Sequence, residues 1–420
     1  MMAGPWEPLR HKPFRYLVAG RIVSSCGGAI APLALAFAVL DLTGSVSKLG
    51  LVVGARTVAN VVFLLVGGVI ADRLPRRLIM IVSSALAALT QAAVATLVIT
   101  HQATVGSLMV LGALNGIVSA FAMPASSAVL AQTVPAGIRK QAVAINRLAQ
   151  TSINIGGAAI GGVLIAFFTP GPCLALDAIT FAVAAVLFAG VRVAQQPAAA
   201  GPQQAGMLRE LRVGWREFVA NTWVWVVVLG FCFYNAAISG VLGVLAPAIA
   251  DKTFGRTGMG LVLGAEAVGM ALGALYAMRV NHRYLLRFGV LCTSGCVGLL
   301  ISLALSPRLL VLLPVAFGSG LMIEQFGVAW EASMTEHIAA DKLARVYSYD
   351  AVGSFVAIPI GQVAAGPIAV ATSPKTAVLI AAGIAGLSVL GMLLSRSVRT
   401  LAHEPKGQPQ PPEPTLVAAS

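Results

Sequence analysis

The most informative stretch of this chain is Gly67-Gly68-Val69-Ile70-Ala71-Asp72-Arg73-Leu74-Pro75-Arg76-Arg77, which separates two long apolar runs. Three arginines and an aspartate so close together are too costly for a helix inside the hydrocarbon of a bilayer. The stretch is therefore expected to be a short aqueous turn between two membrane spans. Because loops rich in Lys and Arg stay on the cytoplasmic side, the turn also orients the chain.

The composition is that of a polytopic membrane protein. Of 420 residues, 58% are hydrophobic and 10% are charged, whereas about a quarter of the residues in a soluble domain are charged. The net charge of +13 does not indicate nucleic-acid binding, because the basic residues lie in short loops between apolar runs. The five cysteines lie within or beside apolar runs, so neither a disulfide framework nor a metal site is expected.

Twelve segments are apolar enough to be membrane spans, since a span needs about 20 residues to cross about 30 Å of hydrocarbon. With both termini in the cytoplasm, most of the Lys and Arg residues fall on the cytoplasmic side, as the positive-inside rule requires. The predicted spans are 16–40, 46–70, 78–99, 105–133, 141–168, 173–192, 221–249, 257–278, 285–305, 309–335, 344–371 and 375–395.

A change of composition divides the chain near its middle. Residues 193–207 combine Pro, Gly, Ala and Gln without an apolar period, which is typical of a flexible linker. Apolar residues then recur at helical spacing from Leu208 to Phe218 opposite three arginines, which predicts a short amphipathic helix at the inner headgroup layer. The predicted parts are an N-terminal six-helix bundle (1–192), a cytoplasmic linker with this helix (193–220), a C-terminal six-helix bundle (221–396) and a disordered cytoplasmic tail (397–420).

The two halves contain an internal repeat. Residues 134–162 align with residues 338–366 at a constant shift of 204 positions, and a weaker copy of the charged turn occurs at 277–283, where Met278 replaces Asp72. Two related six-span bundles around an axis along the membrane normal are a known transporter architecture, with the binding site between them near the midplane. The matched positions include Gly157 with Gly361, Gly162 with Gly366, and Asn146 with Asp350.

These features resemble the major facilitator superfamily. Residues 68–77 are similar to the loop motif between its second and third spans, and the layout of six plus six spans agrees over nearly the whole chain. Segments 41–45, 176–181 and 345–361 resemble the bacterial subgroup that includes enterobactin exporters and macrolide efflux pumps. The resemblance implies an all-α membrane protein of the major facilitator fold, with twelve transmembrane helices in two pseudo-symmetric six-helix bundles.

The function implied by the resemblance is secondary active export from a bacterial plasma membrane. The substrate would be a small amphiphilic molecule such as a drug, siderophore or secondary metabolite, exchanged for protons by alternating access. The alternative is a facilitator or importer of a small solute in the same fold. The chain lacks the motifs G-x-x-x-x-G-K-[ST] and H-E-x-x-H, so neither an ATP-driven pump nor an enzyme is expected.

The charged turn and two polar positions of the repeat are the expected cytoplasmic gate. Asp72 is expected to lie near a helix N-terminus and neighbouring arginines, which would latch this side in one conformation. The arginines are explained equally well as topology signals that bind anionic headgroups. Arg147 and Asp350 lie at adjacent positions of the repeat alignment, which suits gate ion pairs. The predicted gating residues are Gly68, Asp72, Arg73, Arg76, Arg77, Arg147 and Asp350.

Carboxylates inside the spans are the candidates for proton coupling, because a charged group within a span normally faces a cavity or a partner. Glu324, near the middle of its span, is the first candidate, since burial favours the neutral form of a carboxylate and so allows proton exchange. Glu331 lies seven residues later on the same helical face. Glu266 is the second candidate, with permanent pairing to Arg56 or to a polar neighbour as the alternative, and Asp177 is expected to be structural.

The substrate cavity is expected between the halves. Met and aromatic side chains offer adaptable apolar surface there, and Asn and Gln orient a ligand through hydrogen bonds. The expected partners are a small-molecule substrate, protons and the lipid bilayer, with no cofactor, metal or nucleic acid, and the protein is expected to be a monomer. The predicted cavity residues are Ser25, Asn115, Met123, Phe231, Tyr234, Asn235, Met322 and Gln325.

Overall fold

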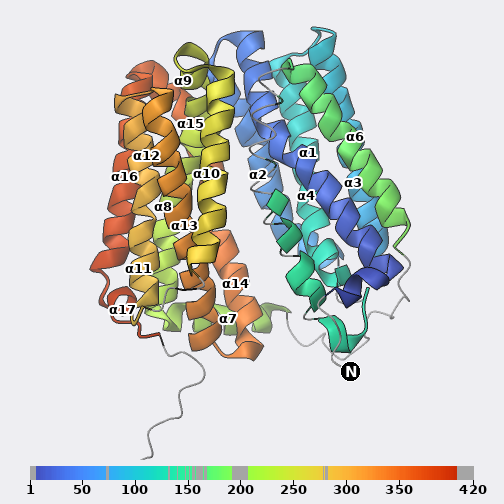
Figure 1. The fold of residues 1–420 in the computed structure, drawn as a ribbon, viewed down its shortest axis with the longest axis vertical. Helices are drawn as coiled ribbons and strands as arrows, with labels where there is room; N and C mark the ends of the chain where they lie inside the picture. Colours follow the sequence, from blue (N-terminus) through green and yellow to red (C-terminus); the bar gives the residue numbers. More distant parts are fainter. Residues whose placement is uncertain are drawn as a thin grey trace, which may run out of the picture.

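The fold is described from a computed structural model, and every long element in it is a helix (Figure 1). The structure describes residues 6–71, 75–130, 133–139, 141–146, 148–150, 152–153, 157, 164, 168–191, 207–277, 279 and 282–403. Asp72, Arg73 and Arg147 of the predicted gate therefore lie outside the described residues.

The N-terminal half contains five long helices among the described residues. They are apolar on nearly all sides, as expected of helices that contact protein on one face and lipid on the other. Two short 3-10 turns, η1 (Glu7–Arg10) and η2 (Ala136–Ile138), accompany them. The helices are α1 (Lys12–Thr43), α2 (Val46–Ala71), α3 (Arg76–Ile99), α4 (Val105–Leu130) and α6 (Pro170–Ala189).

The C-terminal half repeats this pattern with several interrupted helices. One span is built from α8 (Thr222–Gly240), a π-helical turn η3 (Val241–Leu245) and α9 (Ala246–Lys252). The other elements are α7 (Met207–Ala220), α10 (Gly255–Ala277), α11 (Leu285–Cys292), α12 (Ser294–Leu305), α13 (Leu309–His337), α14 (Ala340–Phe355), α15 (Ile358–Ala371), α16 (Pro374–Leu394) and α17 (Arg396–Arg399).

The helices agree with the predicted spans to within a few residues. Ten segments of the described chain are long and apolar enough to cross a membrane, and α4 coincides with the predicted span 105–133. The predicted span 141–168 lies mostly outside the described residues, so it stays a prediction. Large apolar side chains on the outside, such as Leu310 (87% exposed) and Val186 (72% exposed), form a surface that requires a lipid environment.

The two bundles lie side by side, and the distance between them changes along their length (Figure 1). They approach each other at the end of the molecule where α1 finishes, called here the Thr43 end, and diverge toward the opposite Lys12 end. At the Thr43 end, α2 packs directly against α15 of the other half. A Cβ added at Gly50 would come within 2.5 Å of the carbonyl oxygen of Gln362, and one added at Gly366 would collide with Ser47. The bundles therefore touch through their backbones there.

The internal repeat appears as equivalent packing in the two halves. A Cβ at Gly157 would come 2.7 Å from the Cβ of Ala29 in α1, and a Cβ at Gly361 would collide with the backbone of Ala236 in α8. These two glycines are matched in the sequence repeat, and α1 and α8 are each the first span of their half. The pseudo-symmetry predicted from the sequence therefore has a structural counterpart in helix packing.

The amphipathic helix predicted after the linker is α7, and it packs on the C-terminal half. The ring centroids of Trp215 and Phe218 lie 5.6 Å and 5.8 Å from that of Tyr349 in α14. Lys342 Nζ donates to Glu217 Oε2 at 2.9 Å. The helix is therefore attached to α14, and its placement at the headgroup layer stays a prediction.

The structure describes the first residues of the segment 397–420 that the sequence predicts as a tail. Arg396–Arg399 form α17, in which Val398 is fully buried. His403 Nδ1 lies 2.9 Å from Glu336 Oε2 at the end of α13. The structure thus describes contacts of the first residues of this segment, residues 404–420 lie outside the described residues, and the disordered tail stays a prediction.

Candidate functional site

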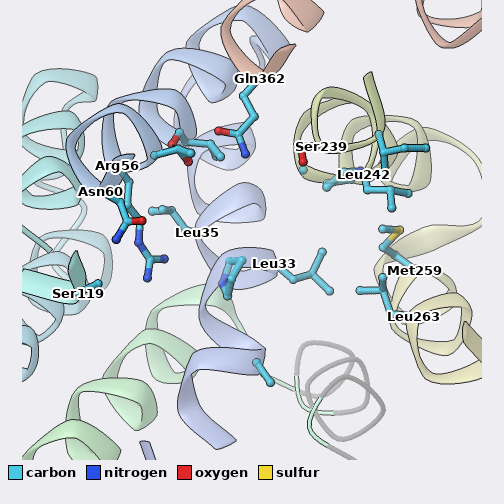
Figure 2. Close-up of a pocket in the computed structure, with 17 residues that line it drawn as sticks. Leu33, Leu35, Arg56, Asn60, Ser119, Ser239, Leu242, Met259, Leu263 and Gln362 are labelled. Atoms are coloured by element: carbon cyan, nitrogen blue, oxygen red, sulfur yellow. The ribbon is translucent and has the colours of Figure 1, made fainter. Parts of the chain in front are cut away.

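A cavity of about 570 Å³ lies between the two halves (Figure 2). Both bundles contribute to its wall, as expected for a carrier of two related halves. The N-terminal half supplies Ala29, Pro32, Leu33, Leu35, Val53, Arg56, Thr57, Asn60 and Ser119. The C-terminal half supplies Ile238, Ser239, Leu242, Gly243, Pro247, Met259, Leu263 and Gln362.

The wall is mostly apolar and carries a few polar groups in the middle of the spans. Arg56 is the charged side chain among the described residues of this wall, and Asn60 follows it one turn later on α2. Figure 2 shows these two side chains together on one wall and Met259 and Leu263 on the facing one. Asn60 Nδ2 donates to the carbonyl oxygen of Gly116 in α4 at 3.1 Å, which fixes its amide against the neighbouring helix.

The two halves place a charged residue at equivalent helix crossings beside the cavity. A Cβ added at Gly116 of α4 would collide with the carbonyl oxygen of Arg56 in α2. A Cβ added at Gly320 of α13 would collide with the carbonyl oxygen of Glu266 in α10. Gly116 and Gly320 are separated by the same shift of 204 positions as the repeat. Arg56 and Glu266 are thus structural counterparts of opposite charge.

Comparison with known proteins identifies the family. Residues 3–417 match the transmembrane secretion effector family of the major facilitator superfamily. The chain belongs to this family. It is therefore a multi-pass membrane transporter and not an enzyme, as the sequence predicted.

Individual relatives of this secretion effector are distant. The multidrug efflux pump Tap of Mycolicibacterium fortuitum is 24% identical over 374 residues, which cover 85% of this chain and 89% of the pump. A bacterial homologue of the lysosomal transporter Spinster, solved in an inward-facing and unoccupied conformation, is 14% identical with a TM-score of 0.72, covering 93% of this chain and 98% of its own. The nucleoside transporter NupG is 14% identical with a TM-score of 0.66, covering 91% and 98%. These structures show the major facilitator fold.

The predicted cavity residues of this transporter do not coincide with the described cavity wall. None of the eight belongs to the described cavity wall, and the side chain of Met123 lies outside the described residues. Polar members instead hydrogen-bond neighbouring helices: Asn115 Nδ2 to Thr90 Oγ1 at 3.2 Å, Tyr234 Oη to the Thr293 carbonyl at 2.9 Å, Asn235 Nδ2 to the Ser354 carbonyl at 3.0 Å and Gln325 Nε2 to the Gly273 carbonyl at 2.7 Å.

The apolar members pack inside the C-terminal half. The ring centroids of Phe231 and Phe326 lie 4.2 Å apart in a stacked arrangement, and Met322 borders Gly295 of α12. Ser25 of α1 is half-buried. A role of these residues in substrate binding stays a prediction. None of the residues that line the described cavity was predicted as a cavity residue, and these include Arg56, Asn60, Ser119, Met259 and Gln362. The sequence contained one signal of this wall, because a charged residue and an amide one turn apart are unusual inside an apolar span.

The described gate residues make contacts within their own halves. Gly68 lies in the last turns of α2, and the side chain of Arg76 lies outside the described residues. Arg77 donates to the carbonyl oxygen of Ala189 at the end of α6. Asp350 accepts hydrogen bonds from Trp330 Nε1 at 3.1 Å and Ser354 Oγ at 2.9 Å. The predicted ion pairs of the cytoplasmic gate stay predictions.

The three candidate acids differ in their relation to the cavity. Glu266 continues the face of α10 that carries Met259 and Leu263, one turn closer to the Lys12 end. Glu266 and Arg56 are both described residues, and they form no ion pair with each other. The permanent pairing of Glu266 with Arg56 therefore does not occur in this conformation. Glu324 is half-buried on α13 beside Gly273 of α10, and Glu331 lies two turns further along α13.

An arginine joins the two halves at the Thr43 end. Arg256 of α10 reaches α1, where its Nη1 donates to Asp41 Oδ2 at 3.0 Å and its Nη2 to Asp41 Oδ1. Its guanidinium also lies 4.7 Å from the ring centroid of Phe37. Within its own half, Arg256 Nε donates to Asp251 Oδ1 at 2.7 Å. This bidentate pair links α10 to α1 across the two halves at the Thr43 end.

Removing the Asp41 carboxylate is expected to loosen this closure. In Asp41→Asn, Arg256 loses the bidentate contact between the halves, so the population open at the Thr43 end should rise. The matched control is Asp251→Asn, which removes a carboxylate from the same arginine but leaves the contact between the halves. Spin labels at exposed residues Gln102 and Lys375, in a background without the five native cysteines, report the distance. Equal distance distributions in both variants would contradict the closure role.

Proposed function

We propose that this protein is a secondary carrier that exports a small amphiphilic molecule from a bacterial cell in exchange for protons. The observation that carries the proposal is the cavity between the halves, with apolar walls and a few polar groups around Arg56. Such walls accept varied apolar bodies, and the polar groups orient them. The similarity to a protein named a multidrug efflux pump supports export rather than uptake.

The proposed orientation places both termini in the cytoplasm. The Lys12 end is then cytoplasmic and the Thr43 end extracellular, which follows from the distribution of Lys and Arg. In this orientation the contacts of Arg256 and of Gly366 with the other half close the extracellular side. The charged turn with Asp72 and Arg73, together with Arg147 and Asp350, would form the opposing cytoplasmic gate. Alternating access then requires the two closures to alternate.

Transport in inside-out vesicles tests this function. Vesicles from cells overproducing the protein are energised so that their interior becomes acidic, and the uptake of labelled drugs, siderophores and metabolites is measured. A one-for-one exchange driven by about one pH unit supports about tenfold accumulation, because about 1.4 kcal/mol corresponds to a factor of ten. A protonophore should abolish the accumulation. Vesicles from cells without the protein are the control.

The alternative function predicts a different result. A facilitator or importer of a small solute would equilibrate its substrate at a rate that the protonophore does not change. If every transported compound equilibrates and none accumulates, this alternative therefore replaces the export proposal.

A further inference from the structure

Arg56 is a cation in the middle of a membrane helix and lines the central cavity. Among the described residues of that wall it is the charged one. It forms no hydrogen bond or ion pair with another residue in the part of the chain that the structure describes. A charged group within a span is costly and normally has a partner or a function. The donors of its guanidinium are therefore available to a ligand in the cavity.

A counter-charge for Arg56 lies behind the cavity wall. Asp177 of α6 is 2% exposed, and its Oδ1 has no hydrogen-bond partner among the described residues. It interacts electrostatically with Arg56 without forming an ion pair with it. Its carboxylate packs so closely on α1 that a Cβ at Gly27 would collide with Oδ1. Asp177 is thus an acid close to Arg56 that takes up none of its guanidinium donors in the described part of the chain.

The opposite half contributes a second unsatisfied group. Gln362 of α15 lines the same cavity and is 8% exposed, and its Oε1 has no hydrogen-bond partner in the described part of the chain. A buried amide oxygen without a donor costs free energy unless a ligand or water supplies one. Figure 2 shows Gln362 reaching toward the space that Arg56 and Asn60 border. A molecule in the cavity therefore meets a cation from one half and an acceptor from the other.

We propose that Arg56 binds an acidic group of the substrate, so that the exported molecules are amphiphiles that carry a carboxylate or a similar anion. The planar guanidinium donates two parallel hydrogen bonds to such a group, and the low dielectric of the apolar walls strengthens the contact. The apolar body of the substrate then lies against Met259 and Leu263, and a donor on it reaches Gln362. This inference rests on the proposed function and names the substrate class of the same cavity.

Three probes with one apolar body and different head groups test the inference. Naphthaleneacetate carries a carboxylate, naphthaleneacetamide is its neutral amide, and naphthalenemethylamine is a cation. Equilibrium dialysis against the full-length protein in lipid nanodiscs measures the binding of each by its fluorescence, with empty nanodiscs subtracted. We expect the carboxylate to bind at least about tenfold more tightly than the amide, because its contact with the guanidinium is charge-assisted and bidentate. The amine should bind weakest.

The variant Arg56→Gln should remove the preference. Its affinity for the carboxylate is expected to fall about tenfold or more while that for the amide changes less than about threefold. The matched control is Lys48→Gln, which removes one positive charge from the exposed start of the same helix and should keep the preference. Arg56→Lys keeps the positive charge but not the planar guanidinium, so it should retain part of the preference for the carboxylate.

Several outcomes would overturn the inference. They are equal binding of the three probes, a preference that survives in Arg56→Gln, and no binding of any probe to the wild type. The proposed function fails separately: if the preference depends on Arg56 but no compound accumulates in energised vesicles, the anion site stands and proton-driven export does not. If export occurs and Arg56→Gln leaves head-group selectivity unchanged, proton-driven export stands and the anion site does not.

Discussion

Replacing Gly366 of α15 with leucine is expected to abolish transport and to leave the two halves apart at the Thr43 end. Even a Cβ at this position would collide with Ser47 of α2, in the other half. On the facing helix, Gly50 approaches the Gln362 carbonyl as closely. Overpacking of this kind costs about 1–3 kcal/mol. Because the collision exists only when the halves are closed, it shifts the equilibrium toward the open conformation by about 5- to 150-fold.

The distance between spin labels at Gln102 and Lys375 measures this shift, and uptake into energised vesicles measures the loss of transport. The matched control is Gly383→Leu on α16, where an added Cβ meets no atom within 4 Å. This control should retain both the closed distance and transport. If Gly366→Leu transports normally, the backbone contact between α2 and α15 is not required for the transport cycle.

The spans could be predicted because they depend on hydrophobicity alone. A helix that is apolar on nearly every side is visible in a sliding window whichever way its faces point, so the predicted spans agree with α1, α2, α3 and the later helices within a few residues. The amphipathic helix α7 was equally visible, because its apolar residues recur with helical period. The family resemblance followed from the charged turn at residues 68–77 and from the six-plus-six layout.

The cavity residues could not be predicted because depth in the membrane does not specify rotation of a helix. Asn115, Tyr234 and Gln325 lie at suitable depths, but each turns toward a backbone or side-chain partner on a neighbouring helix, since polar groups within a bundle must be hydrogen-bonded. Arg256 and Asp41 illustrate the second difficulty. They are 215 residues apart, and no local pattern connects them before the two halves are placed together.

The second large effect is expected at Glu266. The variant Glu266→Gln should lose accumulation against a gradient and retain exchange of labelled for unlabelled substrate. Glutamine keeps the size of the side chain and resembles its neutral, protonated form but cannot release a proton, so the carrier still moves with substrate while the link to the pH gradient is lost. Measurements of uphill uptake and of exchange in the same vesicles separate the two activities.

The structure favours Glu266 over Glu324, the first candidate from the sequence, for two reasons. Glu266 continues the cavity face of α10, and its backbone occupies the same crossing in its half that Arg56 occupies in the other. A substrate anion on Arg56 would then lie at the cavity wall and a proton on Glu266 one turn beyond the opposite wall, so that each alters the free energy of loading the other. Glu324→Gln and Glu331→Gln are the matched comparisons and should keep accumulation. If accumulation is lost in Glu324→Gln and kept in Glu266→Gln, the coupling carboxylate is Glu324, and proton exchange takes place at the contact of α13 with α10 instead of on the face of α10 that continues the cavity wall.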